Sequence, residues 1–283
     1  MKNVPLGIID VPIGIIGFGH MGKAIFQALK KNSIKKNGWG KIYTSDGEKN
    51  AAVAKKSKVI ILAVKPVAVR EVLREISQSL QTLQPLQKDQ LIISIAAGIS
   101  LRVIENELRK NFQRDRKNQK GRQHPRTPAL VRVMPNLPAQ TGSGMSVWKS
   151  LKPLNPRNKT LVKSILRAFG EEIEVKSENL IDSATAVSGS GPAYVFAFLS
   201  SLAKSANKLG FSQAHAKRIA LQTVSGSSLY ANHSPSLTFD KLVSQVKTKG
   251  GTTEAAFKIL DKKKWQAIFE QAIFAAYRRA KKL

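Results

Sequence analysis

Two short segments rich in glycine and hydroxyl groups combine the residue types that can bind a carboxylate. The first is Ser188-Gly189-Ser190-Gly191-Pro192, and the second is Lys247-Thr248-Lys249-Gly250-Gly251-Thr252-Thr253. Each directly precedes an expected helix, so its hydroxyls and free backbone N–H groups would lie at the positive end of a helix dipole. Ordinary helix capping would explain either loop alone. Two such loops in one helical region favour an anion site.

A third glycine-rich segment, residues 17–22, has the spacing G-x-G-x-x-G. It follows the apolar run at residues 13–16 and precedes apolar residues at helical spacing, the order that a dinucleotide fingerprint requires. In that fingerprint Gly17 permits the turn, Gly19 lets the backbone approach a pyrophosphate, and Gly22 lets the helix pack on the strand. The segment therefore predicts a dinucleotide site at the start of this helix.

The residues that follow the second expected strand leave the choice between NAD and NADP open. Asp46 can accept a hydrogen bond from a ribose hydroxyl, which would favour NAD. The hydroxyls of Thr44 and Ser45, together with Lys49, can instead bind a 2′-phosphate. A turn that starts the next helix explains the same residues equally well.

These segments need a framework of strands and helices, and the pattern predicts one. Apolar runs at residues 41–44, 59–64 and 91–95 alternate with a helix near residues 67–80, which favours a doubly wound, Rossmann-like parallel sheet. From residue 155 onward the sequence shows helical periods and no strand-like run. We expect a dinucleotide-binding domain at residues 1–150 and an all-helical domain at 151–283, with helices at residues 161–169, 193–209, 213–230, 239–246, 254–260 and 265–280. Several helices are apolar around much of their circumference, which indicates a dimer interface.

Composition excludes several classes of site. The 283 residues include no cysteine, so disulfides, thiolate nucleophiles and cysteine-ligated zinc are excluded. The four histidines share no short metal-ligand spacing, so we expect no metal site. We find no apolar run long enough to span a bilayer and no signal-peptide layout at the start, so a cytoplasmic protein without a membrane partner is expected.

The chain is strongly basic, with 47 Lys and Arg against 18 Asp and Glu, a formal net charge of +29. Residues 109–126 are the densest basic stretch, and their low hydrophobicity predicts a mobile loop. Such a loop can touch nucleic acid, but it contains nothing that resembles a base-reading element. We prefer a general compositional bias toward lysine as the explanation and expect no nucleic-acid partner.

Six ordered blocks of sequence resemble the pyrroline-5-carboxylate reductase family over nearly the whole chain. Its most specific pieces are Met134-Pro135-Asn136, the segment from Ser188 to Tyr194, and the Gly-Gly-Thr-Thr loop at residues 250–253. The other blocks are residues 17–22, 63–66 and 94–99. The resemblance implies an N-terminal Rossmann domain, a helical dimerisation domain, and reduction of L-1-pyrroline-5-carboxylate to L-proline with NADPH or NADH, the last step of proline biosynthesis. It also implies a homodimer that assembles further, commonly into a decamer.

The resemblance also implies roles for individual residues. Asn136, Ser188, Ser190 and Thr252 are the expected catalytic residues. The cofactor would lie along Gly17, Phe18, Gly19, His20, Met21, Gly22, Thr44, Ser45, Ala63, Val64, Lys65, Pro66, Ala96, Ala97 and Gly98. The substrate would be held by Met134, Pro135, Asn136, Ser188, Gly189, Ser190, Gly191, Gly250, Gly251, Thr252 and Thr253, the last four from the partner subunit.

Three departures from the family keep alternatives open. The interval between Thr44 and Val59 is shorter than in typical members by about a helix and a small strand. In the family this region helps to bind the adenosine end of the cofactor, so the difference affects the expected cofactor affinity and the choice between NAD and NADP. Ala197 stands where some members have a threonine considered as a proton donor. Residues 109–126 are an insertion, and Leu137 replaces the usual threonine. A β-hydroxyacid-dehydrogenase-like or other imine-reducing enzyme, and a catalytically degenerate basic relative that binds nucleic acid, are the alternatives.

Overall fold

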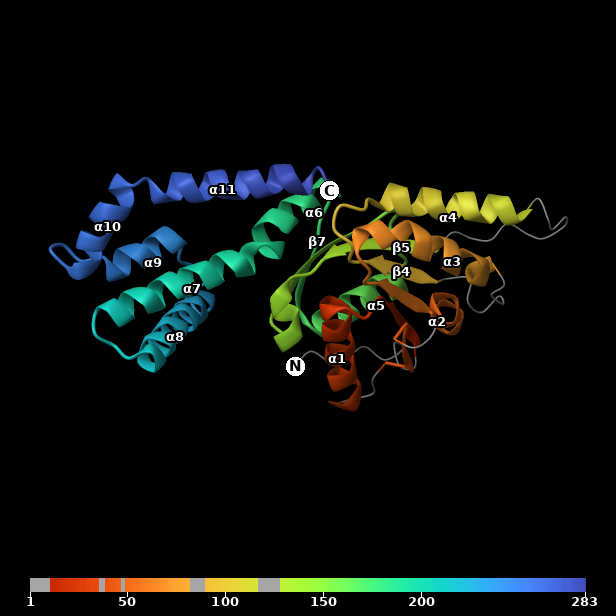
Figure 1. Ribbon diagram of the computed structural model, residues 1–283, viewed down its shortest axis with the longest axis horizontal. Coiled ribbons are helices and arrows are strands. Elements are labelled where there is room, and N and C mark those ends of the chain that lie inside the picture. Colours follow the sequence, from red (N-terminus) through yellow and green to blue (C-terminus); the bar gives the residue numbers. More distant parts are fainter. Residues whose placement is uncertain (1–10, 36–38, 47–48, 82–89, 117–127) are drawn as a thin grey trace. The chain divides into compact units, whose positions relative to one another are not determined.

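The computed structural model describes residues 11–35, 39–46, 49–81, 90–116 and 128–283 (Figure 1). Contacts divide the chain into two compact units. One contains Met1–Gly189 together with Tyr277–Leu283, and the other contains Ser190–Ala276. The expected dinucleotide-binding domain at residues 1–150 and helical domain at 151–283 stay a prediction.

The first unit is built on a seven-stranded sheet with the order β2-β1-β3-β4-β5-β6-β7. Every neighbouring pair is parallel except β5 and β6, which are antiparallel. The strands are β1 (Ile13–Ile16), β2 (Ile42–Thr44), β3 (Val59–Leu62), β4 (Leu91–Ser94), β5 (Ala129–Met134), β6 (Gly144–Ser150) and β7 (Gly170–Glu174). The predicted fold class, a Rossmann-like sheet followed by helices, is confirmed.

Helices cover both faces of this sheet, which explains why its central strands are mostly apolar. All four residues of β1, β3 and β4 are buried. One face packs against α1 (His20–Lys35) and α5 (Pro156–Arg167), and the other against α2 (Asn50–Lys56), α3 (Val69–Gln81) and α4 (Leu101–Arg116). Figure 1 shows α3 and α4 together on one side of the strands.

The strand order also fixes where a ligand can bind. The chain passes from β1 to β2 on one side, and then returns to β3 on the other side of β1. At such a switch point the connections leaving adjacent parallel strands diverge, and they open a crevice at the carboxyl ends of the strands. The loops that follow β1, β3, β4 and β5 all leave from this edge.

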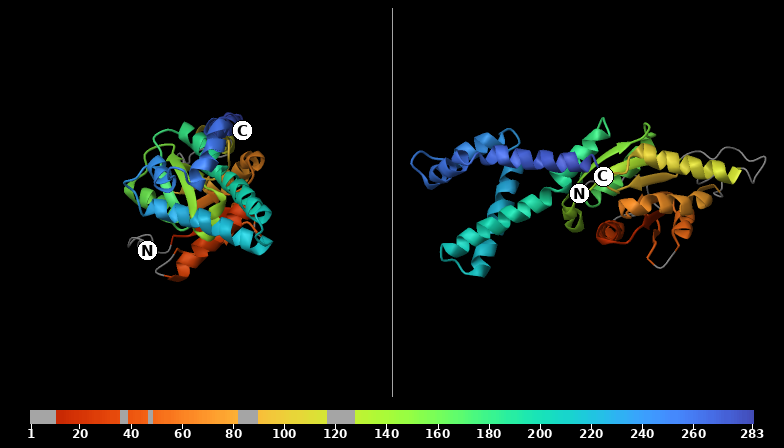
Figure 2. Two further views of the ribbon diagram at one scale, coloured as in Figure 1. Left: turned by 90° about the vertical axis from the view of Figure 1, so that its left-hand side faces the viewer. Right: turned by 45° about the horizontal axis from the view of Figure 1, so that its top comes forward.

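The remaining elements are mainly helical. After β7 come α6 (Asn179–Ala184) and a short π-helical turn η4 (Thr185–Gly189). The second unit contains α7 (Gly191–Lys208), α8 (Gln213–Asn232), α9 (Phe239–Val246), α10 (Thr252–Lys262) and most of α11 (Trp265–Ala280). Figure 2 shows α7 and α8 as a helical hairpin. The first and last residues predicted for α9 and α11 are confirmed.

Two expectations about local structure are wrong. The region after residue 155 contains a strand, β7, whose sequence Gly-Glu-Glu-Ile-Glu lacks apolar alternation. Its inward residue is Glu172, which accepts from the Trp148 indole N–H and from Arg167 and so replaces an apolar contact. The basic stretch 109–126 is helical over residues 109–116, because Leu101, Ile104 and Leu108 form an apolar stripe that anchors α4. Residues 117–126 lie outside the described residues.

Strands β5 and β6 and the helices α4 and α6 were not predicted, and α2 is the helix that one of the open alternatives for residues 44–46 implied. Helix α2 occupies seven residues of the interval between β2 and β3 that the sequence indicated to be short. Its Val53 and Ala54 are buried against the sheet. The short interval therefore still contains a helix that packs on the sheet.

Candidate functional site

The glycine turn after β1 is shaped by close backbone packing. Gly17 has φ of 94°, and a Cβ on it would lie 2.6 Å from the carbonyl carbon of Ala63. A Cβ on Gly22 would overlap the carbonyl oxygen of Gly17. Gly17 is required by its positive φ and by the nearby backbone, and Gly22 by the backbone contact alone, because a main-chain carbonyl cannot move aside as a flexible side chain can.

Gly19 differs from its two neighbours, because a Cβ there would meet nothing within 4 Å. Steric packing within the protein thus does not require glycine at this position. Helix α1 begins at the next residue, His20, and has no acidic residue in its first turn. An open backbone surface at a positive helix end is the environment in which a pyrophosphate binds. The geometry fits a dinucleotide at residues 17–22.

The end of β2 is tied directly to this turn. The backbone N–H of Gly17 donates to the Ser45 hydroxyl oxygen over 2.9 Å, and the Ser45 N–H donates to the Ile15 carbonyl over 3.0 Å. Asp46 and Lys49 are both exposed. The side chain that accepts a hydrogen bond from the glycine turn is thus an uncharged hydroxyl.

The other residues expected along the cofactor follow β3 and β4. Lys65 is the N-cap residue of the short 3-10 helix η1 (Pro66–Ala68), which begins four residues after the end of β3, and its side chain makes no capping bond. Residues 96–98 form the turn after β4, where Gly98 has φ of 74°. Since β1, β3 and β4 are parallel neighbours, the structure brings their three loops to one edge of the sheet.

Asn136, directly beyond β5, holds two loops together through its side-chain amide. Its Nδ2 donates to the Ser188 carbonyl oxygen over 3.1 Å, and its Oδ1 accepts from the Met145 N–H over 2.9 Å. Gly189 packs closely on the same segment, because a Cβ on it would lie 2.7 Å from Met134 Cε. Four predicted site residues, Met134, Asn136, Ser188 and Gly189, are therefore in contact within the first unit.

Ser188 and Gly189 end the π-helical turn η4, a type of distortion that is often found at functional sites. The Ser188 hydroxyl donates to the Ala184 carbonyl over 3.1 Å. Its proton is therefore engaged within its own helix.

The remaining predicted substrate residues lie in the second unit. Ser190 is the N-cap of α7 but makes no side-chain capping bond, and a Cβ on Gly191 would meet nothing within 4 Å. In the second loop, the Gly250 N–H donates to the Glu254 carboxylate over 2.9 Å. Gly251 is the N-cap residue of α10. The hydroxyl of Ser190 is thus not used to cap its own helix, whereas one N–H of the second loop is taken by Glu254.

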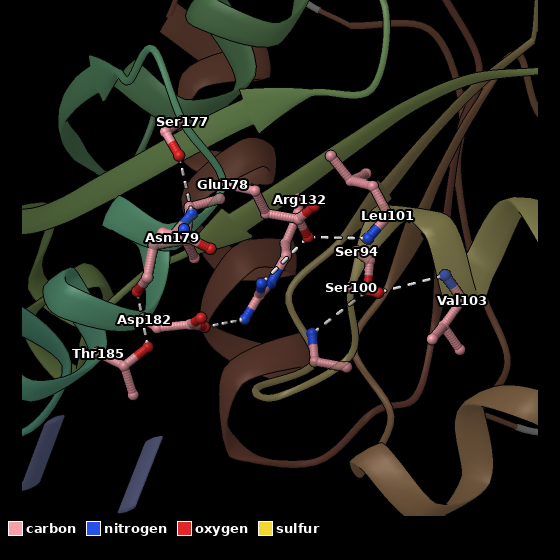
Figure 3. Close-up of polar contacts among 12 residues, drawn as sticks. Ser94, Ser100, Leu101, Val103, Arg132, Ser177, Glu178, Asn179, Asp182 and Thr185 are labelled. Atoms are coloured by element: carbon pink, nitrogen blue, oxygen red, sulfur yellow. Dashed lines mark hydrogen bonds and ion pairs between the residues drawn. The ribbon is translucent and has the colours of Figure 1, made fainter. Parts of the chain in front are cut away.

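The sequence interpretation missed a buried charged cluster beside these loops, shown in Figure 3. Arg132 in β5 has a side chain that is 4% exposed and pairs with Glu178 and Asp182 at 3.1 and 2.7 Å. A single arginine inside the apolar run Ala-Leu-Val-Arg-Val-Met was the signal that could have revealed it. Among the described residues no group of three His, Asp or Glu side chains could hold a metal ion.

The second unit exposes many large apolar side chains. In α7, Val195, Phe196 and Phe198 are 45%, 53% and 59% exposed. The helical run Asn179–Lys208 is, by length and composition alone, apolar enough to cross a membrane, and 11% of its window is buried. The sequence-based statement that no such run exists therefore needs correction.

Comparisons with known proteins bear on both halves of the chain. A family model described as pyrroline-5-carboxylate reductase dimerisation matches residues 178–283. A model described as NADP oxidoreductase, coenzyme F420-dependent, matches residues 12–98. The exposed apolar residues of α7 fall within the region that matches the dimerisation model.

Individual relatives match over almost the full length. The pyrroline-5-carboxylate reductase of Escherichia coli strain K12 is 34% identical over 96% of this chain and 97% of its own, and that of Haemophilus influenzae is 30% identical over the same shares. Among solved structures, the Coxiella burnetii pyrroline-5-carboxylate reductase is 30% identical, with a TM-score of 0.80, over 96% of this chain and 98% of its own. The Plasmodium falciparum pyrroline carboxylate reductase with NADP bound is 28% identical, with a TM-score of 0.79, over 97% and 98%.

Proposed function

The chain belongs to the pyrroline-5-carboxylate reductase family, and we propose that it reduces L-1-pyrroline-5-carboxylate to L-proline with NADPH, the last step of proline biosynthesis. The observation that carries this is the similarity to named reductases over 96% of the chain, at 30–34% identity. The glycine turn supports it physically, because Gly17 and Gly22 are fixed by packing while Gly19 leaves the backbone open to a phosphate.

NADP(H), when bound, supplies a hydride to an electrophilic carbon. The residues that would hold it are the turn at residues 17–22, Thr44 and Ser45, residues 63–66, and residues 96–98. We place them in a nucleotide-binding domain at residues 1–150. An uncharged Ser45 beside the Gly17 N–H supports NADPH, because a carboxylate there would repel a 2′-phosphate. NADH is the alternative cofactor.

The substrate is a cyclic imine that carries a carboxylate, and a protonated imine is already electrophilic. The protein therefore has to bind and orient it more than to activate it. The residues proposed to contact it offer hydroxyls, amides and backbone N–H groups, which suit a carboxylate at a helix N-terminus. A proton for the ring nitrogen can come from solvent or from a hydroxyl.

We assign the roles of the candidate catalytic residues as follows. Asn136 orients the loop that contains Ser188, since its amide binds the Ser188 carbonyl. Ser190, whose hydroxyl makes no capping bond, donates to the substrate carboxylate. Thr252 and its neighbours Gly250, Gly251 and Thr253 contact the same carboxylate from the partner subunit.

The proposed assembly is a homodimer formed through residues 151–283, which associates further, up to a decamer. The exposed apolar side chains of α7 support a partner surface in this region. We propose a cytoplasmic location.

The test of the function is oxidation of NADPH, and separately of NADH, by purified protein in the presence of pyrroline-5-carboxylate, with proline quantified directly. Proline formation above the enzyme-free control, with a higher kcat/KM for NADPH, is expected. Folded protein that forms no proline with either cofactor would contradict the proposal and favour a degenerate relative.

A further inference from the structure

Strand β5 contains one charged residue, the buried Arg132. Arg132 lies on the same face as Leu130 and Met134, since alternate residues of a strand share a face. Its guanidinium donates to Glu178 Oε1 over 3.1 Å and to Asp182 Oδ1 over 2.7 Å (Figure 3). Burying a cation is costly unless it is paired in a specific geometry, so this cluster strongly constrains α6 relative to β5.

Glu178 also joins the cluster to a second helix. Its carboxylate oxygen accepts from the Leu101 N–H, the first residue of α4, over 2.8 Å. Although Glu178 is the N-cap residue of α6, its side chain makes no capping bond to that helix. Helix α4 has no acidic residue in its own first turn, so Glu178 supplies the negative charge at its N-terminus. One carboxylate thus ties together β5, α6 and α4, the helix that follows the turn at residues 96–98.

The contacts between β5 and the α6–η4 segment follow a register. Arg132 pairs with Asp182, Met134 packs on Gly189, and Asn136 binds the Ser188 carbonyl. The three residues from β5 and its continuation are each two apart in sequence. Asp182 in α6 and Ser188 and Gly189 in η4 belong to one continuous helical segment, because η4 begins at the residue that follows α6. The ion pair therefore lies in the same row of contacts as the substrate-facing turn.

We propose that Arg132 and Asp182 are positioning residues that set the rotation of α6, and thereby the placement of the Ser188–Gly189 backbone at the substrate site. This inference rests on the proposed function, because it assigns a purpose to the placement of that backbone. Neither side chain needs to touch the substrate. Glu178 has a broader role, since it stabilises both this segment and the start of α4 on the cofactor side.

The two carboxylates should therefore have separable effects. Asp182→Ala removes one charge-assisted hydrogen bond, the bond from Arg132 that holds α6 in place. Because the Ser188–Gly189 backbone would then be misplaced, the KM for pyrroline-5-carboxylate should rise about tenfold or more. The NADPH dissociation constant, measured by fluorescence without substrate, should stay within about twofold. Asp182→Asn keeps an acceptor oxygen for Arg132 and should restore part of the loss. Glu178→Ala should weaken both substrate and cofactor binding.

Glu172→Ala is the matched control for Asp182→Ala. Glu172 on β7 is also a carboxylate paired with an arginine; its side chain is 4% exposed, and it binds Arg167 at 2.7 Å and the Trp148 indole at 2.8 Å. Glu172→Ala should lower the thermal midpoint of unfolding without changing KM. A readout independent of turnover is hydrogen–deuterium exchange of the full-length protein. Asp182→Ala should accelerate exchange at residues 185–189 by about tenfold or more and leave α5 unchanged.

The outcomes separate the inference from the proposed function. Wild-type protein without proline formation would contradict the function, and exchange at residues 185–189 would still decide the inference. If the wild-type protein is active, either of two results for Asp182→Ala would overturn the inference. In the first, Asp182→Ala changes neither KM nor exchange. In the second, its KM and NADPH dissociation constant rise in step, as expected from general loosening of the fold.

Discussion

The side-chain amide of Asn136 donates to the Ser188 carbonyl over 3.1 Å while its oxygen accepts from the Met145 N–H over 2.9 Å. Both faces of the amide are thus used within the protein. Nδ2 carries a second N–H beyond the one that binds Ser188. The two observed bonds fix the backbone of the proposed substrate loop relative to the end of β5, which is an indirect contribution to binding.

Asn136→Asp separates these two bonds. The carboxylate can still accept from Met145, but it places two acceptor oxygens against each other at Ser188. We expect kcat/KM for pyrroline-5-carboxylate to fall about tenfold or more, equivalent to about 1.4 kcal/mol or more. Asn111→Asp is the control, because Asn111 donates to Ser77 between α3 and α4. If both variants lose activity in proportion to their stability, Asn136 has no special role at the substrate loop.

Gly19 and Gly17 should respond differently to a side chain. Gly19→Leu meets open space in the free protein, so the thermal midpoint should stay close to that of the wild type while NADPH binding weakens about tenfold or more. Gly17→Ala should instead destabilise the fold by about 2 kcal/mol or more, because of its positive φ and the nearby Ala63 carbonyl. Calorimetry and fluorescence titration measure both effects. Unchanged NADPH affinity in Gly19→Leu would remove residues 17–22 from the cofactor site.

Much of this cofactor region was predictable from the sequence, and the reason is physical. The apolar runs of β1, β3 and β4 are buried on both faces, so their composition alone identifies them. Gly17 is restricted by a backbone conformation that few other residues adopt. Such local constraints are visible in a single sequence without knowledge of distant contacts.

The dimer surface can be tested with a single charge. Phe198 on α7 is 59% exposed, and Phe198→Glu would place a carboxylate in the proposed apolar interface. We expect the dimer dissociation constant to rise about tenfold or more, measured by sedimentation at several protein concentrations. Val67→Glu, at a position that is 90% exposed outside the proposed interface, should not change the assembly. Equal assembly of the wild type and Phe198→Glu would show that α7 does not form the interface.

The two serines of the first glycine loop are expected to differ. The Ser188 hydroxyl donates to the Ala184 carbonyl, so Ser188→Ala should change KM by less than about threefold. Ser190 makes no capping bond, and a hydrogen bond from its hydroxyl to a carboxylate would be charge-assisted. Ser190→Ala should therefore raise KM for pyrroline-5-carboxylate about tenfold or more. Steady-state kinetics at saturating NADPH would reveal an error in this assignment if Ser188→Ala were the more damaging change.

The parts that the sequence did not predict depend on contacts between distant residues. Glu172 looks like a surface residue until Trp148 and Arg167 are brought to it, and for this reason β7 lacks a strand-like pattern. Arg132 finds its partners more than forty residues away, at separations of 46 and 50. Helix α4 was obscured because basic residues outnumber the apolar stripe that anchors it. The spacing of apolar residues in the sequence indicates which face of a helix or strand is buried. It does not indicate which charged side chains pair with one another.

The most direct test of the central claim is to follow the hydride itself. Wild-type protein would be given pyrroline-5-carboxylate and NADPH deuterated at C4 of the nicotinamide, with each of the two stereoisomers in turn, and the proline analysed by mass spectrometry. We expect one stereoisomer to yield proline carrying a single deuterium at the former imine carbon, and Gly19→Leu to form much less of it at the same NADPH concentration. Folded wild-type protein that forms no proline, or only unlabelled proline with both stereoisomers, would contradict the central claim.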